Sequence, residues 1–148
     1  GGGQHDEELA LKARPWAERG VFEIQPAMPQ DALYETVYPR IDVCLLFSES
    51  EGLGNVPLEA MMHGVVPVVS DFTGRRTAGL LRPDETALVF PVGDVDAAAD
   101  AVARLARDAD LFRSLSMLGR RELEGWHRVA DMAEGWALAL DQALDGPP

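Results

Sequence analysis

Cysteine is almost absent from the sequence, whose 148 residues include a single one, Cys44. Because a lone thiol has no partner in the chain, a framework of internal disulfides is excluded. Cys44 lies inside the apolar run "IDVCLLF". We therefore expect a buried, inert thiol in a reducing compartment rather than a reactive cysteine.

Positive charge is also scarce. The chain has 13 Lys and Arg against 25 Asp and Glu, which gives a net charge of -12. Nucleic-acid-binding proteins use clustered cations to replace the counterions of phosphate, so a broad nucleic-acid interface is excluded. Any phosphate that this chain binds must be held locally, by backbone N–H groups or by a few cations.

Long apolar runs are missing as well. No window approaches the roughly 20 apolar residues that cross a bilayer, and the opening "GGGQHDEE" has no feature of a signal peptide. We expect a cytoplasmic protein, and peripheral attachment of a longer protein to the inner face of a membrane stays open. The chain is 47% hydrophobic and 26% charged, which is typical of one folded domain.

Short apolar runs alternate with helical patterns through the first two thirds of the chain. Strands are expected over residues 20–26, 41–47, 65–71 and 87–93. Ala32, Leu33, Val37 and Tyr38 have helical spacing, and Gly64 stands where a helix ends. Alternating strands and helices predict right-handed βαβ units, and therefore an α/β fold with a parallel sheet covered on both faces.

The rest of the chain predicts helices alone. They are expected over residues 96–109, 108–125 and 128–144. Asp94 or Asp96 is the expected cap of the first helix, and Met132, Trp136 and Leu140 follow a helical repeat in the third.

The beginning of the chain suggests an incomplete unit. The run "GGGQHDEELALKA" is typical of a turn that connects a strand to a helix, yet no strand precedes it. Three glycines before an acidic helix start suit a tight turn at the end of a strand. We therefore expect that the sequence starts inside a larger domain and is truncated at its N-terminus.

The run "IDVCLLFSESEGLGNVPLEAMMHG" predicts a strand, a loop and a helix in succession. Gly52 and Gly54 allow the backbone to approach a ligand, Asn55 or Val56 is the expected helix cap, and Pro57 is the expected first helical residue. Open N–H groups and the positive end of the helix dipole favour a diphosphate there. Ligands of open α/β sheets bind at this edge.

Two carboxylates flank that loop and need another role, because they would repel phosphate. Glu51 and Glu59 can accept hydrogen bonds from neutral hydroxyls of a sugar or a ribose, and Glu51 can also assist charge development in a reaction. The residues alone leave a simpler alternative. Glu59 would then be an acid favoured by the helix dipole, worth roughly 0.3 to 1 kcal/mol, beside an ordinary βα turn.

The same segment resembles the signature of retaining glycosyltransferases of the GT-B architecture, particularly the family 4 (group 1) enzymes, whose string reads "S..EGFG.P.LEAMA.G.PVV.S..GG". The matching residues are Ser48, Glu51, Gly52, Leu53, Gly54, Pro57, Leu58, Glu59, Ala60, Met61, Gly64, Pro67, Val68, Val69, Ser70 and Gly74. The resemblance extends over essentially all 148 residues. It identifies residues 1–148 as part of the C-terminal, Rossmann-like, donor-binding lobe, without its first βα unit and without the acceptor lobe.

This resemblance implies transfer of a sugar, of hexosyltransferase type, from a nucleoside diphosphate sugar to an unknown acceptor with retention of configuration, in polysaccharide or glycolipid synthesis. Glu59 would hold the ribose hydroxyls, Glu51 would be the catalytic candidate beside the sugar, and residues 25–28 would face the base. The implied donor-binding residues are Gly2, Gly3, Glu51, Gly52, Leu53, Gly54, Asn55, Val56, Pro57, Leu58 and Glu59. No metal and no cofactor other than the donor is expected.

The sequence departs from the family at two places. The cations that neutralise the diphosphate in the family would precede Gly1 and the acceptor lobe is absent, so this chain alone is expected to be inactive. Its sheet would have an unfilled position that another chain could fill, so the chain is also expected to be able to oligomerise. After Gly74 the chain reads "RRTAGLL" in place of a second glycine and an acid. Arg75 and Arg76 there would approach a phosphate or an acidic sugar, or would form surface salt bridges.

Two other functions stay open. One is a sugar-nucleotide epimerase of the same two-lobe fold, which would need no acceptor. The other is a nucleotide-binding or interaction module without catalysis. A zinc site is not expected, because His5, His63 and His127 have no His or Cys at a ligand spacing.

Overall fold

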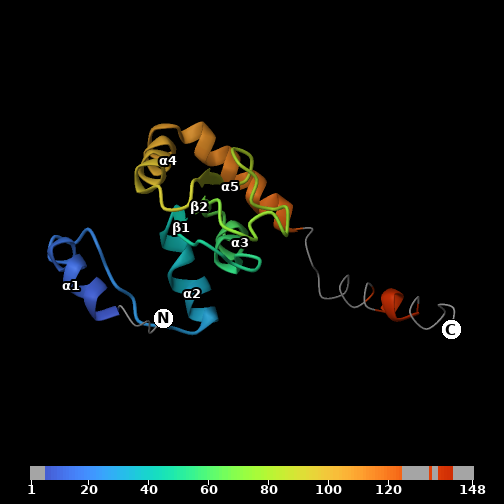
Figure 1. Ribbon diagram of the computed structural model, residues 1–148, viewed down its shortest axis with the longest axis horizontal. Helices are drawn as coiled ribbons and strands as arrows, with labels where there is room; N and C mark the ends of the chain where they lie inside the picture. The colour runs from blue at the N-terminus through green and yellow to red at the C-terminus, as the bar shows by residue number, and fades with distance from the viewer. Residues whose placement is uncertain (1–5, 125–133, 135–136, 142–148) are drawn as a thin grey trace. The chain divides into compact units, whose positions relative to one another are not determined.

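The structure is a computed structural model, and it describes residues 6–124, 134 and 137–141. The chain divides into two units, Gly1–Val37 and Tyr38–Pro148 (Figure 1). The second unit contains the sheet and the predicted loop.

The first unit contains two helices, α1 (Asp6–Ala17) and α2 (Gln30–Thr36). Both helices were predicted. The strand predicted over residues 20–26 is wrong, because these residues are irregular and Val21, Phe22 and Ile24 are exposed. A strand needs a partner for its backbone groups, and no strand in the described part of the chain pairs with this run.

The second unit is built on a parallel sheet of three strands in the order β1-β2-β3. They are β1 (Val43–Leu46), β2 (Val66–Ser70) and β3 (Leu88–Phe90). Val43 is paired with Val66, and Val68 with Leu88. Every residue of the central strand β2 is buried, as its nearly continuous apolar sequence requires. The predicted α/β fold is confirmed.

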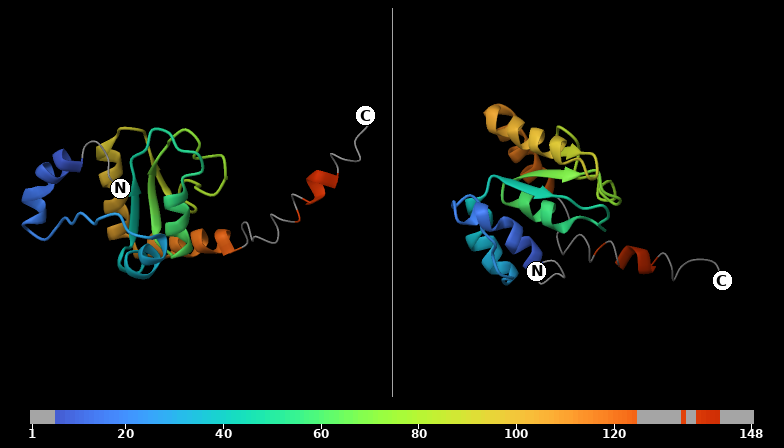
Figure 2. Two further views of the ribbon diagram at one scale, coloured as in Figure 1. Left: turned by 90° about the horizontal axis from the view of Figure 1, so that it is seen from below. Right: turned by 60° about the vertical axis from the view of Figure 1, so that its left-hand side comes forward.

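Helices cover both faces of this sheet (Figure 2). Helix α3 (Asn55–Met62) packs on one face, where its Leu58 and Met61 meet Val69 and Phe72. Helix α4 (Val95–Arg107) packs on the other face. Helix α5 (Ala109–Glu124) contacts both α3 and α4. A short 3-10 helix, η1 (Tyr38–Arg40), precedes β1.

Helix α3 ends where the sequence predicted, at Gly64. This glycine has φ +77°, its N–H donates to the Met61 carbonyl at 3.0 Å, and the Val65 N–H donates to the Ala60 carbonyl at 3.0 Å. The pair of bonds is a Schellman motif, which turns the chain directly into β2. The predicted cap of α4 is also confirmed, since the carboxylate of Asp94 accepts the N–H of Ala97 at 2.9 Å.

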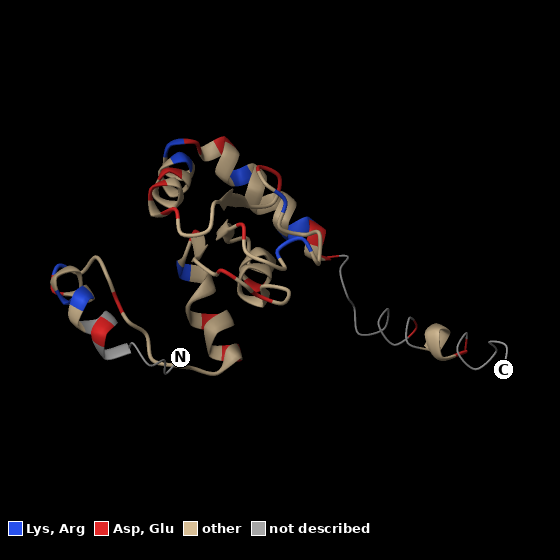
Figure 3. Cartoon of the chain, in the orientation of Figure 1, with Lys and Arg blue, Asp and Glu red and all other residues tan. Residues whose placement is uncertain are grey.

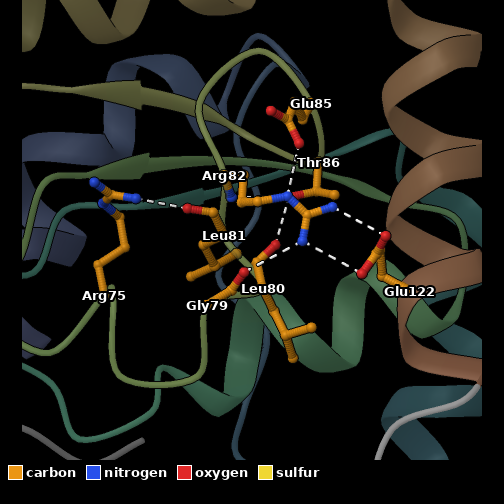
Figure 4. Close-up of polar contacts among 8 residues, drawn as sticks. All are labelled: Arg75, Gly79, Leu80, Leu81, Arg82, Glu85, Thr86 and Glu122. Carbon is orange, nitrogen blue, oxygen red and sulfur yellow. Dashed lines mark hydrogen bonds and ion pairs between the residues drawn. The ribbon is translucent and has the colours of Figure 1, made fainter.

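A polar cluster ties the connection between β2 and β3 to α5 (Figure 4). The Arg82 guanidinium lies 2.7 Å from Glu85 and 3.0 Å from Glu122 of α5, and its hydrogen bond lowers the pKa of Glu122. The hydroxyl of buried Thr86 donates to the Leu80 carbonyl and accepts the Arg82 N–H at 2.9 Å. The connection between β2 and β3, which the structure describes throughout, contains no strand of its own, and this cluster attaches it to α5.

The third predicted helix lies mostly outside the described residues. Glu134 and residues 137–141 are helical, while Met132 and Trp136 are not described. In the part of the chain that the structure describes, no helix is long and apolar enough to cross a membrane.

Candidate functional site

The loop after β1 and the first turn of α3 surround a cavity of about 240 Å³. It is lined by Leu46, Glu51, Gly52, Leu53, Gly54, Asn55, Val56 and Pro57. All of these except Leu46 are residues that the sequence predicts for the donor. The cavity lies at the carboxyl edge of the sheet, the edge at which open α/β sheets bind ligands.

A larger hollow, of about 340 Å³, lies between β1 and helices α4 and α5. Its lining is apolar except for Asp42 and includes Val102, Leu105 and Phe112. The N–H groups that begin α3 lie at the smaller cavity, which therefore has the chemistry of an anion site.

Gly54, rather than Asn55 or Val56, is the N-cap of α3, which corrects the predicted cap. Its φ of 68° and ψ of 60° are left-handed, and a Cβ at this position would lie 2.9 Å from the Phe72 ring. Glycine avoids both the strain and the collision. The helix therefore starts earlier than predicted, and Pro57 is its third residue rather than its first.

This start decides which backbone donors face the cavity. The first intrahelical bond runs from the Leu58 N–H to the Gly54 carbonyl, at 3.4 Å. By helix geometry the N–H groups of Asn55 and Val56 have no acceptor within the helix, and Pro57 has no N–H. Asn55 and Val56 thus provide the available donors, whereas the N–H of Leu58 is already used.

Glu51 is exposed and lines the cavity, and Glu49 is the second acid of the same loop. Figure 3 shows acidic residues in red on this loop beside α3. The hydroxyl of Ser48 donates to its Oε1 at 2.7 Å, which orients the carboxylate. The Glu51 N–H donates to the Thr73 carbonyl at 3.0 Å, so the loop is also attached to the segment after β2.

Glu59 is half-buried on α3 and is not among the residues that line the cavity. Its Oε2 accepts a hydrogen bond from the hydroxyl of Tyr38 at 3.2 Å. Tyr38 is buried, and its ring stacks on His63. Tyr38 was not predicted as a partner of Glu59, because nothing in the local pattern connects residues 21 positions apart.

Arg75 is an internal residue and not a free cation. Its Nε lies 2.8 Å from the Asp71 carboxylate, and its Nη1 donates to the Leu81 carbonyl at 2.6 Å. The Arg75 side chain is only 6% exposed. The hydrogen bond from Arg75 lowers the pKa of Asp71. Arg76 is 81% exposed and lies 3.5 Å from the same carboxylate. Of the two predicted roles, the geometry gives Arg75 the salt bridge.

A separate hollow of about 290 Å³ borders Arg75, Arg76 and Arg82. Arg75 and Arg82 each use their donors on carboxylates and backbone carbonyls, so the local positive charge is already compensated. Gly2 and Gly3, which the resemblance implies as donor-binding residues, lie outside the described residues. Among the described residues, no group of three or more His, Cys, Asp or Glu is placed to hold a metal ion.

A parallel sheet with a glycine loop and a helix start at its carboxyl edge defines a Rossmann-like α/β domain. Comparison with protein families matches residues 1–108 to the family described as "Glycosyl transferases group 1". The chain belongs to this family. A comparison with curated proteins finds no match.

Solved structures with the same fold include several glycosyltransferases. Sucrose-phosphate synthase from Thermosynechococcus elongatus is 22% identical with a TM-score of 0.81, over 96% of this chain and 35% of that one. The C-terminal domain of the group 1 glycosyl transferase LpcC from Francisella tularensis is 18% identical with a TM-score of 0.67, over 83% and 62%. TarM is 18% identical with a TM-score of 0.71, over 91% and 26%.

These likenesses confirm the predicted fold, that of a lobe of a GT-B glycosyltransferase. The chain spans about a third of sucrose-phosphate synthase and less than two thirds of the LpcC domain.

Proposed function

We propose that the cavity at the start of α3 binds a nucleoside diphosphate sugar. In this proposal the protein that contains the chain transfers a hexose with retention of configuration to an acceptor held by another lobe, in polysaccharide or glycolipid synthesis. The donor is the only small molecule required, without a metal ion. The proposal is supported by family membership and by the chemistry of the cavity.

One observation carries the proposal: the predicted donor residues 51–57 line a single cavity at the N-terminus of a helix. The N–H groups of Asn55 and Val56 have no acceptor within α3, and the dipole of the helix is positive at this end. A diphosphate is the ligand group that these donors suit best in a chain of net charge -12, since they need no cationic side chain.

The two glutamates take the neutral parts of the donor. Glu51, oriented by Ser48, borders the cavity next to Gly52 and Leu53 and would accept hydrogen bonds from sugar hydroxyls. A carboxylate there would also stabilise positive charge that develops on the sugar ring during transfer. Glu59, oriented by Tyr38, would accept hydrogen bonds from the two ribose hydroxyls.

Calorimetric titration of the chain with UDP, GDP and ADP tests this function. We expect one of the three to bind, and Glu59→Ala to weaken binding by about 1 to 3 kcal/mol, the usual effect of losing hydrogen bonds to a charged group. Glu49→Ala is the control, because Glu49 is an exposed acid on the loop before α3 and lines no part of the cavity.

The outcomes separate the two parts of the proposal. Equal binding by Glu59→Ala and the unchanged chain would remove Glu59 from the ribose site. If none of the three nucleotides binds at about 1 mM, the donor-binding function itself is wrong.

A further inference from the structure

Residues 70–74, the end of β2 and the segment that follows it, lie directly against the backbone of the loop that carries Glu51. Three contacts connect the two segments, one each at Ser70, Thr73 and Gly74. None of these three residues lines the cavity. Their effect on a ligand must therefore pass through the loop.

Ser70 makes the first contact. It is the last residue of β2 and is completely buried. Its hydroxyl donates to the Ser48 carbonyl at 2.5 Å and also lies 3.5 Å from the Leu46 carbonyl. A buried hydroxyl bonded in this way sets the direction in which the chain leaves β1, just before the loop begins.

Thr73 makes the second contact, by extending the parallel pairing of β1 and β2 beyond the ends of both strands. Its N–H donates to the Glu49 carbonyl at 3.0 Å, and its carbonyl accepts the Glu51 N–H at 3.0 Å. These bonds form an isolated parallel bridge between Ser50 and Thr73. The backbone of Glu51 is thereby fixed on one side.

Gly74 makes the third contact. It has φ +99°, and a Cβ at this position would lie 2.1 Å from the Glu51 carbonyl oxygen and 2.7 Å from that of Gly52. Both atoms belong to backbone and neither can rotate away, so a side chain at position 74 must force the two backbone segments apart.

The other residues assigned to the nucleotide sugar are carried by a different element. Asn55, Val56 and Glu59 belong to α3, which is held by the burial of its Leu58 and Met61 against the sheet. A displacement of residues 51 and 52 would thus alter one side of the cavity and leave the start of the helix in place.

We propose that residues 70–74 form a positioning element that sets the place of Glu51 and Gly52, and that Gly74 thereby controls recognition of the sugar but not of the nucleotide. This inference rests on the proposed function, which assigns residues 51 and 52 to the sugar and the start of α3 to the nucleotide. Gly74 touches no part of the donor and is a positioning residue only.

The test compares Gly74→Ala with Gly79→Ala. Both glycines are in the connection between β2 and β3 and both have positive φ, +99° and +67°, but a Cβ at Gly79 meets nothing within 4 Å. Gly79→Ala therefore introduces backbone strain without the collision. Each variant is titrated with UDP, GDP and ADP and with the glucose ester of each nucleotide.

For Gly74→Ala we expect the dissociation constant of the nucleotide sugar, relative to that of the free nucleotide, to rise about tenfold, as one displaced hydrogen bond to a charged group would cause. Gly79→Ala should leave this ratio unchanged. A general loss of structure would weaken both ligands equally. An unchanged ratio or equal weakening in Gly74→Ala overturns the inference.

Hydrogen exchange measured by NMR without any ligand provides a second readout. In Gly74→Ala the Glu51 amide, which donates to Thr73, should lose protection while the Met61 amide within α3 keeps it. Retained protection of Glu51 overturns the inference. If no nucleotide binds to the unchanged chain, the proposed function fails, and this exchange experiment still decides whether the segment positions the loop.

Ser70→Ala replaces Gly74→Ala in both experiments if the latter does not fold. It removes the bond to the Ser48 carbonyl without introducing a collision. The ratio should again rise, and the Glu51 amide should lose part of its protection. If neither changes, the inference is wrong.

Discussion

The hydroxyl of Tyr38 donates a hydrogen bond to Oε2 of Glu59, at 3.2 Å. The ring of Tyr38 stacks on His63 with a centroid distance of 4.9 Å and an angle of 2° between the planes. The stack fixes the position of the tyrosine, and the hydroxyl in turn orients the carboxylate. The candidate ribose-binding group is thus held by a side chain from another element.

Tyr38→Phe keeps the stack and removes this hydrogen bond. We expect nucleotide binding to weaken about fivefold, or about 1 kcal/mol, because the Glu59 carboxylate loses one of its orienting partners. Titration with whichever of UDP, GDP and ADP binds, and with its 2′,3′-dideoxy analogue, measures the effect. The loss should be confined to the unmodified nucleotide, and equal weakening of both compounds would show that Tyr38 does not act through the ribose hydroxyls.

The Asp71–Arg75 pair predicts a dependence of stability on pH. The Arg75 hydrogen bond lowers the pKa of Asp71 below its ordinary value of 3.8. A carboxylate with a lowered folded pKa stabilises the fold above the ordinary value, and this contribution is lost as the pH falls through the folded value. Asp71→Asn should therefore be less stable than the unchanged chain at about pH 7, by about 1 kcal/mol, because Arg75 is buried but the Asp71 carboxylate is 44% exposed and partly screened by water.

The difference between the two proteins should shrink below pH 3.8. Urea unfolding at about pH 7 and at a pH below 3.8 measures this difference. Asp110→Asn serves as the control, because Asp110 is 91% exposed and its pair with Arg113 should contribute little. A difference for Asp71→Asn that does not change with pH would contradict the prediction.

Thr86 is the buried centre of the cluster in the connection between β2 and β3. Thr86→Val conserves its shape but removes the bonds to the Leu80 carbonyl and the Arg82 N–H. We expect a loss of about 1 to 3 kcal/mol in the free energy of unfolding, because two polar groups lose their partner. Thr86→Ser keeps both bonds, so urea unfolding should find it more stable than Thr86→Val. The reverse order would contradict this account.

Cys44 is buried in β1, and burial raises the pKa of its thiol to about 11. The thiolate is the reactive form, so almost none is present near neutral pH. The folded chain should react with Ellman's reagent at about pH 8 far more slowly than the chain in denaturant. Fast reaction of the folded chain would show that Cys44 is accessible.

The local parts of this site could be predicted from the sequence. The apolar run before Ser48, the glycines at 52 and 54 and the end of α3 at Gly64 all depend on near neighbours. The N-cap at Gly54 was missed because asparagine is a preferred N-cap residue, which favoured Asn55. In the structure the Phe72 ring occupies the space that a Cβ at position 54 would need, so the residue there is glycine.

Contacts between distant segments could not be predicted. Tyr38 meets Glu59, and Ser70 meets Ser48, only after the sheet has formed, and no spacing in the sequence indicates either contact. The strand expected over residues 20–26 failed for a related reason. Its residues favour the β conformation, but a strand also requires a neighbouring strand for its backbone hydrogen bonds. None of the described residues provides such a partner for residues 20–26.

Chemical-shift mapping of the isotope-labelled chain tests whether the start of α3 binds the nucleotide. On addition of the nucleotide that binds among UDP, GDP and ADP, we expect the largest shifts at the amides of Gly52, Gly54, Asn55, Val56 and Glu59. Shifts centred instead on the arginine-lined hollow around Arg76 and Arg82, or no shifts at about 1 mM nucleotide, would contradict it.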